Sequence, residues 1–392
     1  MKAKIYLDFN STHPPDTAAL TMAREFYFTH FANSSGLSLE SQAVNKRIEE
    51  TRAEVAGLIG VAPEQVIFTS CATESNNLLI RYFHANRKEK IFRVFSSPFE
   101  HPSVTETLRL LPDTEVTFLK TDKNGSVDTA VFTATDFSEF ELVTMMAVQN
   151  ESGGIMPLAE LMNALPGGHP PVIADFSQAL PKLADNAPAH LRPDLPGLLT
   201  RKNFFLTATG HKIGAGFGAG LIVAPQDSRS LTQGALFAGG NQEFGARAGS
   251  HNAEAIVAFG AALRHKLAGN DFEKWTAVTR AFETALLQKI SLPHAATVVG
   301  SGATRAPGTT LLLLPGIAID FLIMALDKAG ITVSTGTSCK SRSRSPSAAL
   351  IAMGYSESES LSVVRFSYDQ NLGAAEIAFT AEQTASAVAK LR

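Results

Sequence analysis

Two residues with a capacity for covalent and electrostatic catalysis follow neighbouring hydrophobic runs of the chain. Lys212 comes soon after the run Phe204 to Thr207, in the sequence TGHKIGAG. A lysine held at the end of a strand can form a Schiff base, although a lysine considered alone is more often a surface residue. Asp175 and Gln178 follow the preceding run, in VIADFSQA. An aspartate there favours the catalytic interpretation, because an anion is the usual partner of the pyridinium nitrogen of pyridoxal 5′-phosphate (PLP).

Two further polar groups follow other hydrophobic runs. The run Gln65 to Thr69 continues as SCAT and then enters a helix-like segment, whose amide groups and positive dipole end favour an anion. Without Lys212 and Asp175, this turn would be interpreted as a simple Ser/Thr helix cap. His101, in SSPFEHPSV, could stack on a planar ring or transfer a proton, although an isolated histidine is usually structural.

The glycine-rich segment GHKIGAGFGAG offers a different interpretation. Gly214, Gly216 and Ala219 have the spacing of a dinucleotide-binding fingerprint. That fingerprint must open a helix and be followed about 20 residues later by an acidic residue, whereas Leu221 to Ala224 has the composition of another strand. We therefore expect a glycine-rich hairpin that permits close approach of the backbone, with nucleotide binding as the minor alternative.

The elements that must position these side chains alternate along the first part of the chain. Val44 to Ile59 shows helical spacing of apolar residues, and Gly60 follows where a helix C-cap favours glycine. The strand-like runs are Gln65 to Thr69, Arg93 to Ser96, Leu142 to Val148, Val172 to Ala174, Phe204 to Thr207 and Leu221 to Ala224. Continuous hydrophobicity suits strands covered on both faces, and open α/β sheets bind ligands at the carboxyl ends of their strands.

The pattern changes after about residue 250. Two long helical stretches, Asn252 to Leu267 and Asp271 to Lys289, precede the strand-like runs Thr297 to Val299 and Thr309 to Leu314, and Ala374 to Lys390 forms a last helix. The fold class is therefore predicted to be α/β, with a large domain built on a mainly parallel sheet and a smaller α+β domain. We place the large domain at residues 16–256 and the small domain at residues 1–15 and 257–392.

Composition excludes several function classes. The chain has 392 residues, 45% of them hydrophobic, which is more than one core usually organises. The formal charge of −3 is too balanced for a general nucleic-acid binder. The apolar runs are shorter than the roughly 20 residues of a membrane span, so no membrane partner is expected. The chain has only two cysteines and an N-terminal sequence unlike a signal peptide, so we expect a cytoplasmic location.

Taken in chain order, the motifs resemble those of the cysteine desulfurases, in the class V aminotransferase group of fold-type I PLP-dependent enzymes. The resemblance covers nearly the whole chain, through YLDFNST, IFTSCATESNNL, FEHPSV, VQNESGG, ADFSQA, TGHKIGAG, GGNQEFGARAGSHN, STGTSCKS and VVRFSY. It implies a fold-type I PLP-dependent transferase that acts as a homodimer. The implied reaction converts L-cysteine to L-alanine and passes the sulfur, as a protein persulfide, to an acceptor protein.

The resemblance also implies roles for individual residues. Lys212 matches the lysine that binds PLP covalently, and the other ring positions are Asp175 for the pyridinium nitrogen, Gln178 for the ring hydroxyl and His101 for stacking. The phosphate-binding positions are Ala72, Thr73, Thr209, His211 and Ser250, the last completed across the subunit boundary. Asn150 and Arg365 match substrate-binding positions, with Arg365 expected to hold the amino acid carboxylate through a bidentate pair. No metal ligand is implied.

Cys339 occupies the position of the family's persulfide-forming cysteine, which separates a desulfurase from an ordinary aminotransferase. Lys340, Arg342 and Arg344 would favour its thiolate electrostatically. Lys212, Cys339 and His101 are thus the expected catalytic residues. Cys339 could instead be a free surface thiol in a basic loop, and Cys71 is interpreted as a packing residue.

Some residues depart from the family pattern. DFNST stands where DNNAT is common, Ser250 replaces a threonine, arginines follow Cys339, and FSYDQN follows Arg365 where a glycine-arginine pair is common. Two alternatives therefore stay open. One is selenocysteine lyase or another class V PLP enzyme, and the other is a non-catalytic binding protein that uses the basic loop to contact an acidic partner.

Overall fold

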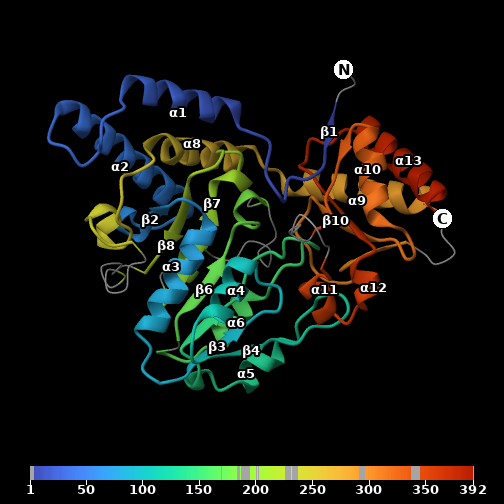
Figure 1. Cartoon of the computed structure of the whole chain (residues 1–392), viewed down its shortest axis with the longest axis horizontal. Coiled ribbons are helices and arrows are strands. Elements are labelled where there is room, and N and C mark those ends of the chain that lie inside the picture. The colour runs from blue at the N-terminus through green and yellow to red at the C-terminus, as the bar shows by residue number, and fades with distance from the viewer. Residues whose placement is uncertain are drawn as a thin grey trace.

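The computed structural model describes residues 4–168, 170–182, 186, 195–199, 201, 203–225, 231, 237–290, 296–336 and 345–391. These residues form two lobes (Figure 1). The larger lobe holds the first part of the chain and a seven-stranded sheet, and the smaller lobe holds most of the last third together with the N-terminal strand. Residues 337–344, which include Cys339 and the basic residues that follow it, lie outside the described residues.

The large sheet has the strand order β2-β8-β7-β6-β5-β3-β4. Its strands are β2 (Val66–Thr69), β3 (Phe92–Ser96), β4 (Thr114–Phe118), β5 (Leu142–Thr144), β6 (Val172–Asp175), β7 (Phe204–Thr209) and β8 (Gly220–Val223). Strand β8 runs antiparallel to both of its neighbours, β2 and β7, while the other strand pairs of this sheet are parallel. The predicted mainly parallel sheet is therefore confirmed. The predicted run Leu142 to Val148 is a strand only as far as Thr144, and the edge strand β4, whose side chains are half-buried or exposed, was not predicted.

Helices cover both faces of this sheet, as its hydrophobic runs require. Along β6, Val172 and Ala174 belong to one buried cluster, while Ile173 belongs to another on the opposite face. The first face packs against α2 (Leu39–Ile59) and α8 (Ala253–Gly269), and the second packs against α3 (Ala72–Ala85) and α4 (Pro102–Leu110). The remaining helices of this lobe are α1 (Thr17–Thr29), α5 (Ala130–Ala134), α6 (Leu158–Ala164) and α7 (Leu195–Leu199).

Helix α2 shows how local sequence sets an element's limits. The side chain of Ser38 accepts a hydrogen bond from the amide of Ser41 and caps the N-terminus. Gly60 has φ 86° at the C-terminus, in the left-handed region that side chains disfavour. The predicted helix and its glycine stop are therefore confirmed.

The smaller lobe has its own buried cluster, formed around two small sheets. One sheet has the order β12-β10-β9, from β9 (Thr297–Val298), β10 (Thr309–Leu313) and β12 (Val363–Ser367); the other pairs β1 (Ile5–Tyr6) with β11 (Ile331–Thr332). Its helices are α9 (Phe272–Lys289), α10 (Ile319–Lys328), α11 (Ala348–Ala352), α12 (Glu357–Ser360) and α13 (Ala374–Lys390). The predicted last helix has the same limits as α13.

The predicted division at residue 256 falls inside helix α8. This helix is continuous from Ala253 to Gly269, packs against α1 and α2, and contributes residues as far as Leu263 to the core of the large lobe. A division after α8 would keep this helix whole and leave it in the same domain as the core that it joins. The domain limits remain a prediction.

The glycine-rich segment forms the predicted hairpin between β7 and β8, and no α-helix begins there. A Cβ atom at Gly220 would lie only 2.6 Å from the carbonyl carbon of Cys71, so glycine is required for this close backbone approach. The hairpin carries the short helix η4 (Gly210–Lys212), which places Lys212 at the carboxyl end of the sheet.

Among the described residues, no helix has the length and apolarity to cross a membrane.

Candidate active site

A cavity of about 290 Å³ opens at the carboxyl ends of β2, β6 and β7. Ten of the residues singled out from the sequence line it: Ala72, Thr73, His101, Asn150, Asp175, Gln178, Thr209, His211, Lys212 and Arg365. Asn10, Ser11 and Gly336 also line it, and they come from segments adjoining the smaller lobe. The cavity is therefore formed by segments from both parts of the fold.

Lys212 lies in a largely buried position in the cavity wall. Its Nζ donates hydrogen bonds to the backbone carbonyls of Asn10 and Ser11, the second at 2.7 Å. Burial and the nearby Arg365 guanidinium together lower the pKa of Lys212 to about 8, although the negative charges of Asp8 and Asp175 oppose the shift. Its amine is thus closer to its nucleophilic, neutral form at neutral pH than an exposed lysine.

Asp175 ends strand β6 and is buried. Its Oδ1 accepts a hydrogen bond from the Ser177 amide at 2.8 Å, and its Oδ2 accepts one from Nδ2 of Asn76 at 3.0 Å. These two donors fix the plane of the carboxylate at the cavity wall. Asn76 belongs to α3 and was not identified from the sequence, where it is one of two consecutive asparagines with no feature to distinguish them.

His101 caps the N-terminus of α4. Its Nδ1 accepts a hydrogen bond from the backbone amide of Ser103 at 3.1 Å. Burial lowers the pKa of His101, and Lys212 lowers it further while Asp175 opposes the shift. The ring is therefore held neutral at the cavity wall.

One side of the cavity has the properties of an anion site. Ala72 and Thr73 form the first turn of α3, and the N-cap residue Cys71 makes no side-chain capping bond. The simple Ser/Thr cap considered from the sequence is thus not observed, and the first-turn amides keep their donor capacity. Thr209 and His211 lie on the same cavity wall, with 3.0 Å between Thr209 Oγ1 and His211 Nδ1. Burial lowers the pKa of His211 to about 4, aided by Lys212 and His101.

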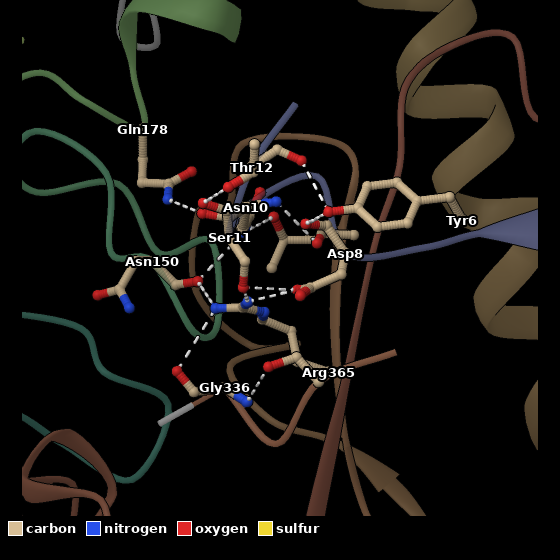
Figure 2. Close-up of polar contacts among 12 residues, drawn as sticks. Tyr6, Asp8, Asn10, Ser11, Thr12, Asn150, Gln178, Gly336 and Arg365 are labelled. Atoms are coloured by element: carbon tan, nitrogen blue, oxygen red, sulfur yellow. Dashed lines mark hydrogen bonds and ion pairs between the residues drawn. The ribbon is translucent and has the colours of Figure 1, made fainter. Parts of the chain in front are cut away.

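The Arg365 guanidinium also lines the cavity and is held by the N-terminal segment (Figure 2). Its NH2 group donates to Asp8 Oδ1 at 2.7 Å and to Ser11 Oγ at 2.8 Å, while NH1 donates to the Asn150 carbonyl at 2.9 Å. Among the described residues, its buried Nε has no hydrogen-bond partner. The pairing with Asp8 was not identified from the sequence, because 357 positions separate the two residues.

A second lysine lies behind the cavity wall and was also missed. Lys182 is fully buried, and its Nζ donates to Thr309 Oγ1 at 3.0 Å and approaches Asn10 Oδ1 at 3.4 Å. Burial lowers the pKa of Lys182 to about 7, with further lowering by Arg365 and Lys212. Asn10 is therefore held by both lysines, because its backbone carbonyl accepts from Lys212 and its side-chain carbonyl faces Lys182.

The other predicted site residues have different outcomes. The side chain of Gln178 donates to the Asn10 carbonyl at 2.9 Å, and Asn150 offers its carbonyl to Arg365. Ser250 is exposed and does not line the cavity of the single chain. Its role across a subunit boundary and the role of Cys339, outside the described residues, remain predictions.

Comparisons with known proteins agree with this geometry. The family model described as aminotransferase class-V matches residues 5–378. The chain is 31% identical to the cysteine desulfurase IscS of Rickettsia bellii, covering 99% of this chain and 92% of the relative, and 30% identical to the cysteine desulfurase of Nostoc sp., covering 99% and 94%. A solved NifS-like protein from Rickettsia africae is similar with a TM-score of 0.80 and 25% identity, covering 98% of this chain and 99% of that chain.

These relatives match over nearly their full length, and the chain brings the expected lysine, aspartate, histidine and arginine into one cavity. The chain belongs to the class-V aminotransferase family, among the cysteine desulfurases.

Proposed function

We propose that this protein is a PLP-dependent cysteine desulfurase that converts L-cysteine to L-alanine and accepts the sulfur as a persulfide on Cys339. The observation that carries the proposal is the cavity in which Lys212, Asp175 and Arg365 meet. An amine, an anion and a guanidinium in one enclosed site match the three parts of PLP–amino acid chemistry: covalent capture, electronic activation and carboxylate binding.

The residues of the cavity fit PLP. The uncapped first turn of α3, with Thr209 and His211 beside it, supplies donors for a phosphate group. Asp175 would pair with the pyridinium nitrogen, His101 would stack on the ring, and Gln178 would bind the ring hydroxyl. PLP, when bound, supplies an electron sink for the bonds at the substrate's α-carbon.

Lys212 is suited to hold and move protons. Its pKa of about 8 lets the amine exist in both protonation states near neutral pH. The hydrogen bonds to the Asn10 and Ser11 carbonyls hold the amine in place before PLP binds. In the proposed reaction, Lys212 takes the proton from the substrate's α-carbon and returns a proton later.

Arg365 binds the substrate carboxylate in this proposal. Asp8 and Ser11 orient its guanidinium plane at the cavity wall. A guanidinium held in this way can bind a carboxylate through paired N–H donors. Asn150, whose carbonyl accepts from NH1 of Arg365, lies beside the same group.

Sulfur transfer requires the Cys339 thiolate. In the proposed step its sulfur forms a bond to the substrate sulfur while the substrate Cβ–S bond breaks, and the electrons pass to the carbon side. That carbon takes up a proton and leaves as the methyl group of alanine. A thiol of an acceptor protein would then remove the persulfide sulfur, and a reducing cytoplasm would keep Cys339 available.

The direct test measures alanine release and locates the sulfur. PLP-loaded protein is incubated with L-cysteine, and persulfides are mapped by mass spectrometry on the two peptides that contain Cys71 and Cys339. We expect alanine with the persulfide on the Cys339 peptide, and loss of both in Cys339→Ala. Full alanine formation by Cys339→Ala would refute the assigned nucleophile. Faster turnover of selenocysteine or cysteine sulfinate than of cysteine would transfer the proposal to another class V reaction.

We also propose a homodimer formed around the surface that carries Ser250. His251 Nδ1 lies 3.0 Å from Ser34 Oγ, so the segment between α1 and α2 lies beside Ser250. Large apolar side chains on and around this segment are exposed: Phe28 71%, Phe31 77%, Leu37 93% and Leu39 83%. Such a patch is typical of a protein interface.

The test of this surface is the solution mass of wild type and of a Leu37→Glu, Leu39→Glu double variant, measured by light scattering. We expect a wild-type mass twice the 41.8 kDa of one chain, and a smaller apparent mass at low concentration for the variant. A monomeric wild type would contradict the homodimer, and an unaltered variant dimer would place the interface elsewhere.

A further inference from the structure

A directed chain of hydrogen bonds joins the four elements β6, β7, α3 and α4 beneath the cavity. Thr207 on β7 donates its hydroxyl to Asn76 Oδ1 at 2.7 Å. Nδ2 of Asn76 donates to Asp175 Oδ2 at 3.0 Å and to Ser103 Oγ at 2.9 Å. The reverse amide orientation would place Oδ1 against the carboxylate oxygen of Asp175, so this orientation of Asn76 is the favourable one.

The chain ends on one nitrogen of His101. The Ser103 backbone amide, 3.1 Å from Nδ1, can only donate, which makes Nδ1 an acceptor. The Ser103 hydroxyl lies 2.9 Å from the same Nδ1. That hydroxyl already accepts from Asn76, so its own hydrogen is free to point to His101. Two donors therefore meet at Nδ1, and the proton of the neutral ring is carried by Nε2.

The surroundings of His101 oppose a second proton. Its Nδ1 faces the N-terminus of α4, where the amides carry partial positive charge. Lys212 and His211 lie on the same cavity wall, and Asp175 is the nearby group that favours a charged ring. Protonating Nδ1 would also break both hydrogen bonds that Ser103 makes to it.

We propose that His101 acts as a fixed, neutral hydrogen-bond donor through Nε2–H, and that Ser103 and Asn76 are the positioning residues that set this state. His101 then does not serve as the general base, and Lys212 carries the proton transfers. The inference deepens the proposed function and rests on it for the identity of the reaction, but the protonation state of His101 is a property of this chain alone.

The protonation state can be read by solid-state ¹⁵N NMR on protein labelled with ¹⁵N-histidine, with and without PLP. His101→Gln assigns the signal by its disappearance. We expect an unprotonated Nδ1 and a protonated Nε2 at neutral and alkaline pH. A proton on Nδ1, or an imidazolium near pH 7, would overturn the proposal. Absence of PLP binding or of alanine formation would refute the proposed function but would not affect the inferred protonation state of His101.

The role of Asn76 is tested by Asn76→Leu, with the adjacent Asn77→Leu as matched control. Leucine at position 76 removes the donor to Ser103 Oγ, so that hydroxyl becomes free to accept a hydrogen bond from a protonated Nδ1. We therefore expect a larger imidazolium fraction of His101 in Asn76→Leu than in wild type at the same acidic pH, and no such increase in Asn77→Leu, because the half-buried Asn77 side chain donates only to backbone carbonyls. A wild-type spectrum for Asn76→Leu would contradict its positioning role.

Two substitutions of His101 distinguish a donor from a base. Glutamine keeps an N–H donor but cannot titrate, whereas leucine removes both properties. A fixed donor predicts that kcat of His101→Gln stays within about tenfold of wild type, while His101→Leu loses roughly 10²-fold or more. A general base would instead give equal losses of kcat in both variants, and the pH dependence of kcat in wild type would follow the titration of His101.

Discussion

Buried charges in two regions of the large lobe are partnered in opposite ways. Beside β2, Arg52 donates to both carboxylate oxygens of Glu243 at 2.7 and 2.9 Å, and His251 and the Phe68 amide complete the shell of Glu243. At the cavity, Lys212 in the lining and Lys182 behind the wall donate only to neutral oxygens among the described residues. The first arrangement pairs buried groups of opposite charge, whereas the second gives the lysine amines hydrogen bonds to uncharged oxygens only.

The pKa values record this difference. Burial would raise the pKa of Glu243, but hydrogen bonds from Arg52 and His251 lower it to about 2. The same pairing holds Glu243 at φ 50° and Phe244 at φ 58°, in the left-handed region that side chains disfavour. In the cavity, burial lowers the pKa values of both lysines. Paired charges thus support the fold, and unpaired charges supply reactivity.

The largest effect is expected for Lys212→Gln. Removing the amine eliminates covalent capture and proton transfer, so alanine release should fall roughly 10³-fold or more. Because the Lys212 amine donates hydrogen bonds only to backbone carbonyls, with Asp8 and Asp175 acting on it at longer range, its removal should cost less unfolding free energy than the loss of a paired buried charge. Steady-state kinetics and urea unfolding measure the two quantities. Activity within tenfold of wild type would remove Lys212 from the chemistry.

Glu243→Gln should instead destabilise the protein. It leaves Arg52 buried without its carboxylate partner, and a broken buried pair costs about 3–5 kcal/mol of unfolding free energy. Glu54→Gln is the matched control, because the Glu54–Arg264 pair is more exposed and should cost less than about 1 kcal/mol. Urea unfolding of both variants makes the comparison. Equal small losses would show that the Arg52 network does not support the fold.

The same network predicts a loss of stability in acid. Because the folded pKa of Glu243 lies below its ordinary value of about 4.5, its contribution is complete above about pH 4.5 and is lost as pH falls towards about 2. Over this range, wild type should lose more unfolding free energy than Glu243→Gln. Parallel acid-unfolding curves for the two proteins would contradict the depressed pKa.

Lys182→Met is expected to change the free energy of unfolding in the opposite direction from Glu243→Gln. Methionine fills a similar volume, and no carboxylate among the described residues contacts the Lys182 amine. We expect a free energy of unfolding equal to wild type or up to about 2 kcal/mol higher. A loss of several kcal/mol, measured in the same urea series, would show that the lysine is a structural donor to Asn10 and Thr309.

The smallest effect is a shift in the titration of Lys212. Because the Arg365 guanidinium lowers the pKa of Lys212, Arg365→Gln should raise that pKa. Competitive acetylation, followed by peptide mass spectrometry, reads the neutral fraction of each lysine against pH. The Lys212 midpoint should lie near 8 in wild type and higher in the variant, and a lower midpoint would contradict the stated cause.

Local sequence patterns were sufficient to identify part of the candidate site. Lys212, Asp175 and His101 each follow a hydrophobic run, and parallel strands bring the ends of such runs to one edge of the sheet. It could not find Asn76, whose function depends on one helix face meeting β6, β7 and α4. Asp8 and Lys182 were missed for the same reason, since their partners come from distant parts of the chain.

The domain division was also difficult to predict locally. Helix α8 is buried over nine consecutive residues, from Ala255 to Leu263, and its apolar sequence alone does not indicate which core the helix joins. Only packing against α1 and α2 assigns it to the large lobe.

The central claim is that the unpaired amine of Lys212 is the reactive group of the cavity. Protein freed of bound cofactor is incubated with PLP, reduced with borohydride and mapped by peptide mass spectrometry. Lys182, also buried and with a lowered pKa but outside the cavity lining, is the internal control. We predict one modified residue, Lys212, with yield rising through about pH 8. Modification of Lys182, or of exposed lysines without Lys212, would contradict the account.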